Sequence, residues 1–266
     1  YAKLGDINAD FVGNYLLGSS SSSAAMGGAI FNNKGEIGDI TGDFIGNYVS
    51  VLSSASVNAE GGAIYNSGGA KFNKVGGIIG NITGDFIGNY ASGQNYAYGG
   101  AIYNVDGGEI GDITGDFIGN YVSSSSSSSY YSDGGAIYNT GTIGDITGDF
   151  IGNYVSSSSS YSEGGAIYND GTIGDITGDF IGNYSSSSTG SMGGAIFNAG
   201  KIGNISGDFI GNYSSSSSSS STGSMGGAIM NMVTIGEITG SFINNKAEST
   251  SGIALGGAIL SMSPIT

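Results

Sequence analysis

Cysteine, histidine, tryptophan and arginine are absent from this chain of 266 residues, and proline occurs once. Without cysteine and histidine, disulfides, thiolate metal sites, imidazole catalysis and histidine pH switches are excluded. Only six lysines stand against 21 acidic residues, which gives a formal net charge of -15. Such a chain cannot neutralise phosphates, so nucleic acid is excluded as a partner. No apolar run is long enough to predict a transmembrane segment.

Glycine is abundant, with 53 residues, but it follows no Gly-X-Y period, which excludes a collagen helix. The apolar residues are mainly Ile, Ala, Tyr and Phe, which favour strands over helices. No segment keeps apolar residues at helical spacing over three turns. The composition therefore predicts an all-β protein.

Two short motifs alternate along the whole chain, and each occurs eight times. The first, Gly-Gly-Ala-Ile, begins at Gly27, Gly61, Gly99, Gly134, Gly164, Gly193, Gly226 and Gly256. The second, Phe-x-x-Asn, begins at Phe11, Phe44, Phe86, Phe117, Phe150, Phe180, Phe209 and Phe242. Self-similarity at a fixed period is typical of a stack of structural repeats.

The spacing of the motifs shows which half of the repeat is constrained. From Gly-Gly to the next Phe the distance is 16 to 18 residues, except for 25 residues where an insertion occurs near 71–77. From Phe to the next Gly-Gly it varies between 13 and 17 residues, within serine-rich stretches such as 123–131. We expect a parallel β-solenoid (a single-stranded parallel β-helix) of about eight coils of about 30 residues, each with two or three short strands and a serine-rich loop. Residues 1–266 would form one domain, as a segment or mature part of a longer exported chain.

Stacked coils turn each repeated position into a column of like residues. We expect the Ile column, including Ile137 and Ile167, and the Phe column, including Phe117, Phe150 and Phe180, to form the core. We expect two Asn columns to form internal amide ladders that hydrogen-bond along the stack. These contain Asn120, Asn153 and Asn183 in one and Asn139 and Asn169 in the other. Because these residues recur identically, a structural role is favoured over a catalytic one.

Two acidic columns are the candidate metal ligands. One contains Asp112, Asp145 and Asp175, and the other contains Asp116, Asp149 and Asp179. Stacked carboxylates repel one another, so they must cap turn amides, remain hydrated or bind cations. Carboxylates could hold calcium, but the glycine-rich nonapeptide of calcium-binding β-rolls is absent. Turn capping is the favoured interpretation, calcium is the alternative, and no other cofactor is expected.

The alternation of Gly-Gly-Ala-Ile with Phe-x-x-Asn resembles the chlamydial polymorphic outer-membrane proteins. The stretch "GGAIYNTGTIGDITGDFIGN" at 134–153 is also similar to β-helix repeats of bacterial surface and autotransporter passengers. The resemblance covers essentially the whole chain. It implies a right-handed β-helix exported to the bacterial cell surface, with adhesion as the usual role. This chain departs from that pattern in its more uniform repeats and in the absence of cysteine.

The function expected is that of an extracellular structural solenoid. The carboxylates recur at the same positions from coil to coil, so the sequence indicates no coil with a distinct cluster that could form an enzyme site. End coils of matching geometry favour self-association head to tail into a filament. The alternative is an adhesin passenger that binds a surface glycan or protein receptor. Ice binding through the column of Thr41, Thr83 and Thr114 is disfavoured, because the coils vary in length. A polysaccharide-active enzyme is disfavoured as well.

Overall fold

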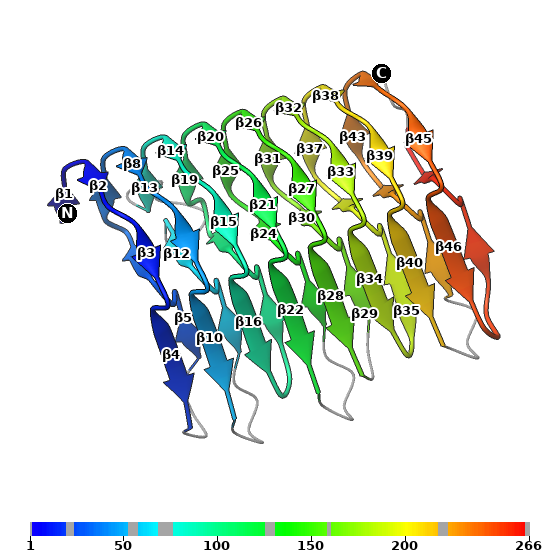
Figure 1. The fold of residues 1–266 in the computed structure, drawn as a ribbon, viewed down its shortest axis with the longest axis horizontal. Helices are drawn as coiled ribbons and strands as arrows, with labels where there is room; N and C mark the ends of the chain where they lie inside the picture. Colours follow the sequence, from blue (N-terminus) through cyan, green and yellow to red (C-terminus); the bar gives the residue numbers. More distant parts are fainter. Residues whose placement is uncertain are drawn as a thin grey trace.

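The computed structural model describes residues 2–19, 24–52, 58–68, 77–125, 131–158, 161–217 and 223–263. Within these ranges the chain forms 48 short strands and no helix. All pairings are parallel, and they join strands of successive coils into six sheets of eight strands each. The expected parallel β-solenoid is therefore confirmed, with the coils stacked along the long axis from one terminus to the other (Figure 1). Each coil contains six strands instead of two or three, because the glycine-rich turns divide it into short segments.

Six strands follow one another in each coil, and we name the sheets A to F in that order. Sheet A contains β1 (Lys3–Leu4), β7 (Glu36–Ile37), β13 (Ile78–Ile79), β19 (Glu109–Ile110), β25 (Thr142–Ile143), β31 (Thr172–Ile173), β37 (Lys201–Ile202) and β43 (Thr234–Ile235). Sheet B contains β2 (Ile7–Asn8), β8 (Ile40–Thr41), β14 (Ile82–Thr83), β20 (Ile113–Thr114), β26 (Ile146–Thr147), β32 (Ile176–Thr177), β38 (Ile205–Ser206) and β44 (Ile238–Thr239). Sheet C contains β3 (Phe11–Val12), β9 (Phe44–Ile45), β15 (Phe86–Ile87), β21 (Phe117–Ile118), β27 (Phe150–Ile151), β33 (Phe180–Ile181), β39 (Phe209–Ile210) and β45 (Phe242–Ile243).

The other three sheets complete the coil. Sheet D contains β4 (Tyr15–Gly18), β10 (Tyr48–Val51), β16 (Tyr90–Gly93), β22 (Tyr121–Ser124), β28 (Tyr154–Ser157), β34 (Tyr184–Ser187), β40 (Tyr213–Ser216) and β46 (Lys246–Ser249). Sheet E contains β5 (Ala25–Met26), β11 (Ala59–Glu60), β17 (Ala97–Tyr98), β23 (Ser132–Asp133), β29 (Tyr161–Glu163), β35 (Gly190–Met192), β41 (Ser224–Met225) and β47 (Ala254–Leu255). Sheet F contains β6 (Ile30–Asn33), β12 (Ile64–Ser67), β18 (Ile102–Val105), β24 (Ile137–Asn139), β30 (Ile167–Asn169), β36 (Ile196–Asn198), β42 (Ile229–Asn231) and β48 (Ile259–Ser261).

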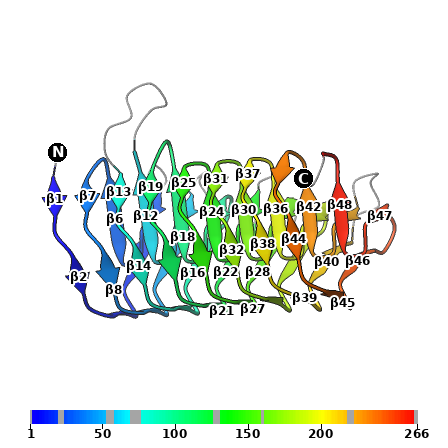
Figure 2. The same cartoon turned by 90° about the horizontal axis from the view of Figure 1, so that it is seen from above.

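The register places each motif residue on its counterpart in the next coil. Phe117 pairs with Phe150, for example, and Ile137 pairs with Ile167. The step between coils varies from 29 to 42 residues, and the longest step carries the insertion, of which 69–76 lie outside the described residues. Figure 2 shows the coils aligned despite these differences in length. Insertions are therefore accommodated between strands without disturbing the stack.

Both glycines of the Gly-Gly motif are required by the backbone at the junction of sheets E and F. Gly134 has a φ of 67°, a conformation that side chains other than glycine rarely adopt. A Cβ on Gly135 would clash with the carbonyl oxygen of Gly165 in the next coil. The first glycine thus permits the turn, and the second permits the coils to approach closely.

The interior is divided into two cores. The larger core contains the Ile and Phe columns of sheets A, B, C and F, and most of these side chains are fully buried. The smaller core lies between sheets D and E and contains small residues such as Val122, Val155 and Ala97. In Figure 1, sheet D forms the lower front part of the molecule. The solenoid is therefore a wide body joined to a thin two-layered arm.

The serine-rich stretches are only partly loops. Residues 126–130, 159–160 and 218–222 lie outside the described residues, but the neighbouring serines form strands of the D–E arm. Ser132 is buried and donates to Ser124 at 2.7 Å, and Ser214 is buried and donates to the carbonyl of Ser191 at 2.9 Å. Small hydroxyl side chains fit between two closely packed sheets because they hydrogen-bond to one another and to the backbone. The expectation of a purely loop-like serine half was thus too simple.

Candidate functional site

The Ile and Phe columns lie in the large core. Ile137 and Ile167 have no exposed surface. The rings of Phe117, Phe150 and Phe180 are also fully buried, and successive ring centroids are 4.8 Å apart with nearly parallel planes. These side chains pack the solenoid and offer no surface to a ligand.

The first Asn column forms a continuous amide ladder at the corner between sheets C and D. The backbone N–H and the Nδ2 of Asn120 both donate to Oδ1 of Asn153 at 3.0 Å. Asn153 repeats this contact with Asn183, and its Nδ2 also donates to the carbonyl of Phe117 at 2.8 Å. All three side chains are fully buried. Each inner amide therefore joins its own coil to the coils before and after it.

The second Asn column does the same at the end of sheet F. Nδ2 of Asn139 donates to Oδ1 of Asn169 at 2.8 Å and to the carbonyl of Thr172 at 3.2 Å. Both side chains are fully buried. Two polar ladders thus run the length of the body, each saturated by its neighbours, which leaves no free amide for chemistry.

The acidic columns cap backbone amides between coils. Oδ1 of Asp112 accepts the N–H of Asp145 at 2.9 Å, and Oδ1 of Asp145 accepts the N–H of Asp175 at 2.8 Å. In the second column, Asp116 and Asp149 accept the N–H groups of Asp149 and Asp179, each at 2.8 Å. The same contact continues along both columns from end to end.

The structure does not assemble these six aspartates into a calcium site. The first column lies in the turns between sheets A and B and consists of Asp112, Asp145 and Asp175. The second lies in the turns between sheets B and C and consists of Asp116, Asp149 and Asp179. The two columns therefore occupy different turns of the coil. Over the described ranges, no three acidic side chains gather in a geometry that could hold a metal ion. One oxygen of each carboxylate is already engaged by a backbone N–H, which suits a turn cap.

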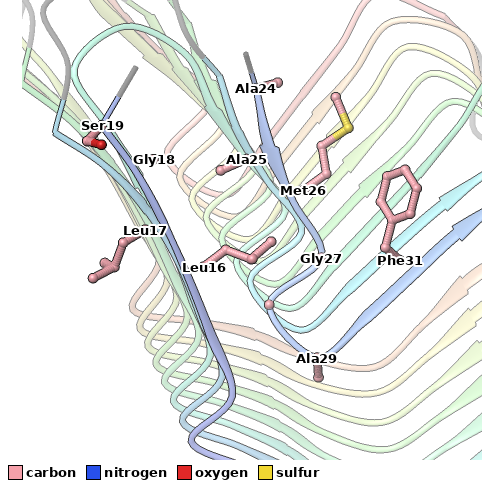
Figure 3. A pocket seen from close by; sticks show the side chains of 11 residues that line it. Leu16, Leu17, Gly18, Ser19, Ala24, Ala25, Met26, Gly27, Ala29 and Phe31 are labelled. Atoms are coloured by element: carbon pink, nitrogen blue, oxygen red, sulfur yellow. The ribbon is translucent and has the colours of Figure 1, made fainter. Parts of the chain in front are cut away.

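A column that sequence reasoning missed lies in sheet E, directly before each Gly-Gly pair. Figure 3 shows its first member, Met26, and its neighbour Phe31 of sheet F, both pointing into the angle between β5 and β6. The chemistry of this position changes along the stack. From the first coil to the last it is occupied by Met26, Glu60, Tyr98, Asp133, Glu163, Met192, Met225 and Leu255.

An aromatic ladder on the outer side of sheet F faces this column. It consists of Phe31, Tyr65, Tyr103, Tyr138, Tyr168 and Phe197, with successive ring centroids 4.6 to 5.5 Å apart. Tyr98 of sheet E packs against it, with its ring 4.9 Å from that of Tyr138. Burial raises the pKa of Tyr138 and of Tyr168, so both remain neutral hydroxyls near neutral pH.

Asp133 and Glu163 are adjacent in the register of sheet E and form a carboxyl pair beside this ladder. Only 4% of Asp133 is exposed, and its Oδ1 has no hydrogen-bond partner. Burial, followed by the nearby charge of Glu163, raises the pKa of Asp133 well above its ordinary value. Burial also raises the pKa of Glu163 to about 7. Two adjacent carboxyls in a poorly hydrated corner resist losing both protons.

Two hollows lie on the outer surface, one along sheet E and one along sheet F. One, of about 240 Å³, is lined by Tyr131, Tyr161, Glu163 and Met192. The other, of about 310 Å³, lies between Tyr103 and Tyr138 and includes Asp106 and Asp170 among its lining residues. The outer surface of sheets E and F therefore combines hollows, aromatic rings and carboxyls whose pKa is raised.

A larger hollow, of about 740 Å³, lies at the first coil. Its lining includes Leu16, Ala25, Met26 and Phe31 (Figure 3). Leu16 is exposed here, and it occupies the position that the buried Val49 occupies in the next coil. This end of the solenoid thus presents core columns at its surface.

No protein family, curated protein or solved structure matches this chain. The resemblance to bacterial surface proteins accordingly rests on the two alternating motifs. In the part of the chain that the structure describes, no helix is long and apolar enough to cross a membrane.

Proposed function

We propose that this protein is an extracellular structural β-solenoid of a bacterial cell surface that extends a filament by stacking its first coil on the last coil of another copy. The proposal rests on one observation: each side-chain ladder ends in hydrogen-bond donors at one end of the solenoid and in acceptors at the other end. Bacterial surface location rests on the motif resemblance.

The Asn corner ladder ends in donors at the last coil and in an acceptor at the first. Within each coil pair, the earlier Asn donates its N–H and Nδ2 to Oδ1 of the later one, as Asn212 does to Asn245 at 2.9 Å. Nδ2 of Asn245 donates to the carbonyl of Phe209, and within the described part no side chain receives its backbone N–H. Oδ1 of Asn14 in a second copy would continue this ladder.

The acidic columns run in the opposite sense and also match. The later residue donates its N–H to the earlier carboxylate, as Ser241 does to Asp208 at 2.7 Å. In a second copy, the N–H groups of Asp6 and Asp10 would meet the side chains of Glu237 and Ser241. Both types of ladder therefore continue through a head-to-tail junction, which satisfies groups that otherwise face water.

The apolar columns of sheets B and C continue through the same junction. Ile7 and Phe11 of the first coil, and Ile238 and Phe242 of the last, are half-buried, whereas their counterparts in inner coils are fully buried. Leu4 is 57% exposed. Covering such side chains would contribute about 25 cal/mol per Å² of apolar surface removed from water.

Sedimentation velocity over a hundredfold range of concentration tests this proposal. We expect species larger than one chain that grow with concentration. Leu4→Glu should abolish the growth, because it places a charge in the junction. Leu52→Glu is the matched control, since Leu52 is 71% exposed and lies on the side of the stack. A single species at all concentrations, or equal effects of both substitutions, would refute stacking.

An adhesin role is the second candidate, and the corner between sheets E and F favours it. An adhesin needs a surface that differs from the repeated scaffold, and the changing column from Glu60 to Met192 provides one. Binding of purified protein to immobilised host-cell or environmental glycans and proteins tests it. Binding that survives Glu163→Gln and Tyr161→Ala together would place any receptor elsewhere.

Enzyme and ice-binding functions receive less support from the geometry. A glycoside hydrolase needs two carboxyls that both reach the scissile bond, but Asp133 is almost completely covered. Sheet B carries one exposed column of Thr residues. The neighbouring column in sheet A is not uniform, since it includes Glu36, Ile78 and Lys201. A flat array of paired Thr ranks is therefore not formed. We propose no catalytic residue.

A further inference from the structure

We propose that the hollow beside Glu163 binds a small organic cation, namely an ammonium or guanidinium group supplied by a polyamine or by a basic side chain of a peptide. This inference does not depend on end-to-end stacking, because the hollow lies on the side of the fifth coil. Four observations on the described residues support it.

First, the carboxyl pair lacks a basic partner. The ion pairs of the described residues are Lys3 with Glu36 and Lys246 with Glu248, both at the ends of the solenoid. No cation contributes to the raised pKa of Glu163 or of Asp133. Buried carboxyls are normally paired, so this pair is a candidate for pairing with a ligand.

Second, one atom of the pair is left unsatisfied. Oδ1 of Asp133 is buried without a hydrogen-bond partner, although native structures satisfy most such atoms. Asp133 lies next to Glu163 along sheet E, so a cation held by Glu163 would also gain attraction from the charge behind it. Glu163 would make the direct contact, because it lines the hollow.

Third, the walls of the hollow suit an organic cation better than a sugar. Its aromatic walls are Tyr131 and Tyr161, whose rings stack on each other with centroids 5.7 Å apart. Each of these two rings covers one face of the other, which reduces the ring surface available for stacking on a pyranose. Hydroxyls and carboxyls at the ring edges provide acceptors for N–H donors.

Fourth, the size and the charge agree. A volume of about 240 Å³ accommodates a cationic head group, and is small for a larger ligand. The net charge of -15 attracts cations towards the surface and increases their rate of encounter.

Binding should depend on pH in a defined direction. The groups that face Glu163 are Asp133 and Tyr161 in sheet E, Tyr138 and Tyr168 in sheet F, and Tyr131 just before β23; Asp170 lies beyond Tyr168. Only the carboxyls change charge between about pH 5 and about pH 8. A cation favours the ionised pair, so affinity should fall as pH falls through about 7, and binding near neutral pH should release protons.

Isothermal titration calorimetry with spermidine, and in a second arm with an acetylated, amidated Lys-Gly-Lys peptide, tests the proposal and distinguishes the two sources. We expect one site per chain for at least one probe, with affinity reduced about tenfold from pH 8 to pH 5.5. Glu163→Gln and Asp133→Asn should each weaken binding about tenfold or more. The Asp133→Asn side chain can still accept the backbone N–H of Glu163, so the fold should be retained; circular dichroism checks this.

Asp145→Asn is the matched control, because it removes the same charge from an exposed column in which Asn81 and Asn204 occur naturally. It should bind like the original protein. Equal weakening by Asp145→Asn would indicate diffuse attraction to an acidic surface and would overturn the proposal. Binding of neither probe, binding that strengthens at low pH, or binding of a neutral β-linked hexasaccharide in their place would overturn it as well. The pH series on the unmodified protein tests the proposal even if a variant does not fold.

Discussion

At the scale of single residues, identical side chains carry out different tasks according to where the coil places them. Asn153 is fully buried and links three coils, whereas Asn81 is exposed and caps one backbone amide. A substitution at Asn153 would leave more groups without a hydrogen-bond partner than a substitution at Asn81. Stability should therefore respond very differently to changes in the two columns.

Asn153→Ala should lower the free energy of unfolding by about 2 to 4 kcal/mol. The substitution leaves the buried N–H and Nδ2 of Asn120 and the carbonyl of Phe117 without a hydrogen-bond partner. Asp145→Asn should change it by less than about 0.5 kcal/mol, since Asn serves in that column elsewhere. Urea unfolding followed by circular dichroism measures both. Similar values for the two variants would contradict the distinction between ladders.

The carboxyl pair should make stability depend on pH. The pKa of Glu163 is raised from 4.5 to about 7 and that of Asp133 is raised as well, so the folded state binds protons more tightly than the unfolded state. This contribution is fully present below the unfolded pKa values and is lost as pH rises through about 7. Melting temperature should thus decrease from about pH 5 to about pH 8. Glu163→Gln should flatten that dependence; an unchanged slope would show that the pair does not titrate there.

Sequence reasoning identified residues that recur and missed those that do not. The Phe, Ile and Asn columns were predictable, because a residue that recurs at the same position of every coil stacks on its counterpart in the next coil. Glu60, Asp133 and Glu163 carry no pattern, since the position that they share is occupied by Met, Tyr or Leu in the other coils. Their burial results from the meeting of sheets E and F, which a linear motif does not reveal. The one available signal was the chemical change directly before Gly-Gly.

At the scale of strands and turns, the fold depends on contacts between coils that local sequence does not encode. Most strands contain only two residues, and their partners lie 29 to 42 residues away. Such strands have no stability of their own, so neighbouring coils must supply the ladder. For the same reason the number of strands per coil was underestimated, and buried serines of the D–E arm were expected to be loops.

Gly135→Ala should be far more disruptive than Gly119→Ala. At Gly135 the added Cβ meets the carbonyls of Gly165 and Tyr154, which belong to rigid backbone. At Gly119 the Cβ meets nothing, and only the positive φ of 60° costs about 1 kcal/mol. We expect a loss of more than about 3 kcal/mol at Gly135. Thermal unfolding of both variants measures the difference, and equal losses would contradict the close-approach role.

At the scale of the whole molecule, the solenoid is a one-dimensional stack in which each coil contacts only its neighbours. Inner coils are covered on both sides, whereas Ile7 and Phe11 of the first coil and Ile238 and Phe242 of the last are only partly buried. The Asn ladder is directed from first coil to last, and the Asp columns are directed from last to first. A head-to-tail junction preserves both directions, which supports the polar filament that we propose.

Electron microscopy of the purified protein shows directly whether the coils of separate copies stack. We expect unbranched rods of uniform width whose lengths are multiples of one eight-coil unit and increase with protein concentration. Leu4→Glu should shorten them to single units, while Leu52→Glu should leave them long. Monodisperse rods one unit long at every concentration would contradict head-to-tail assembly.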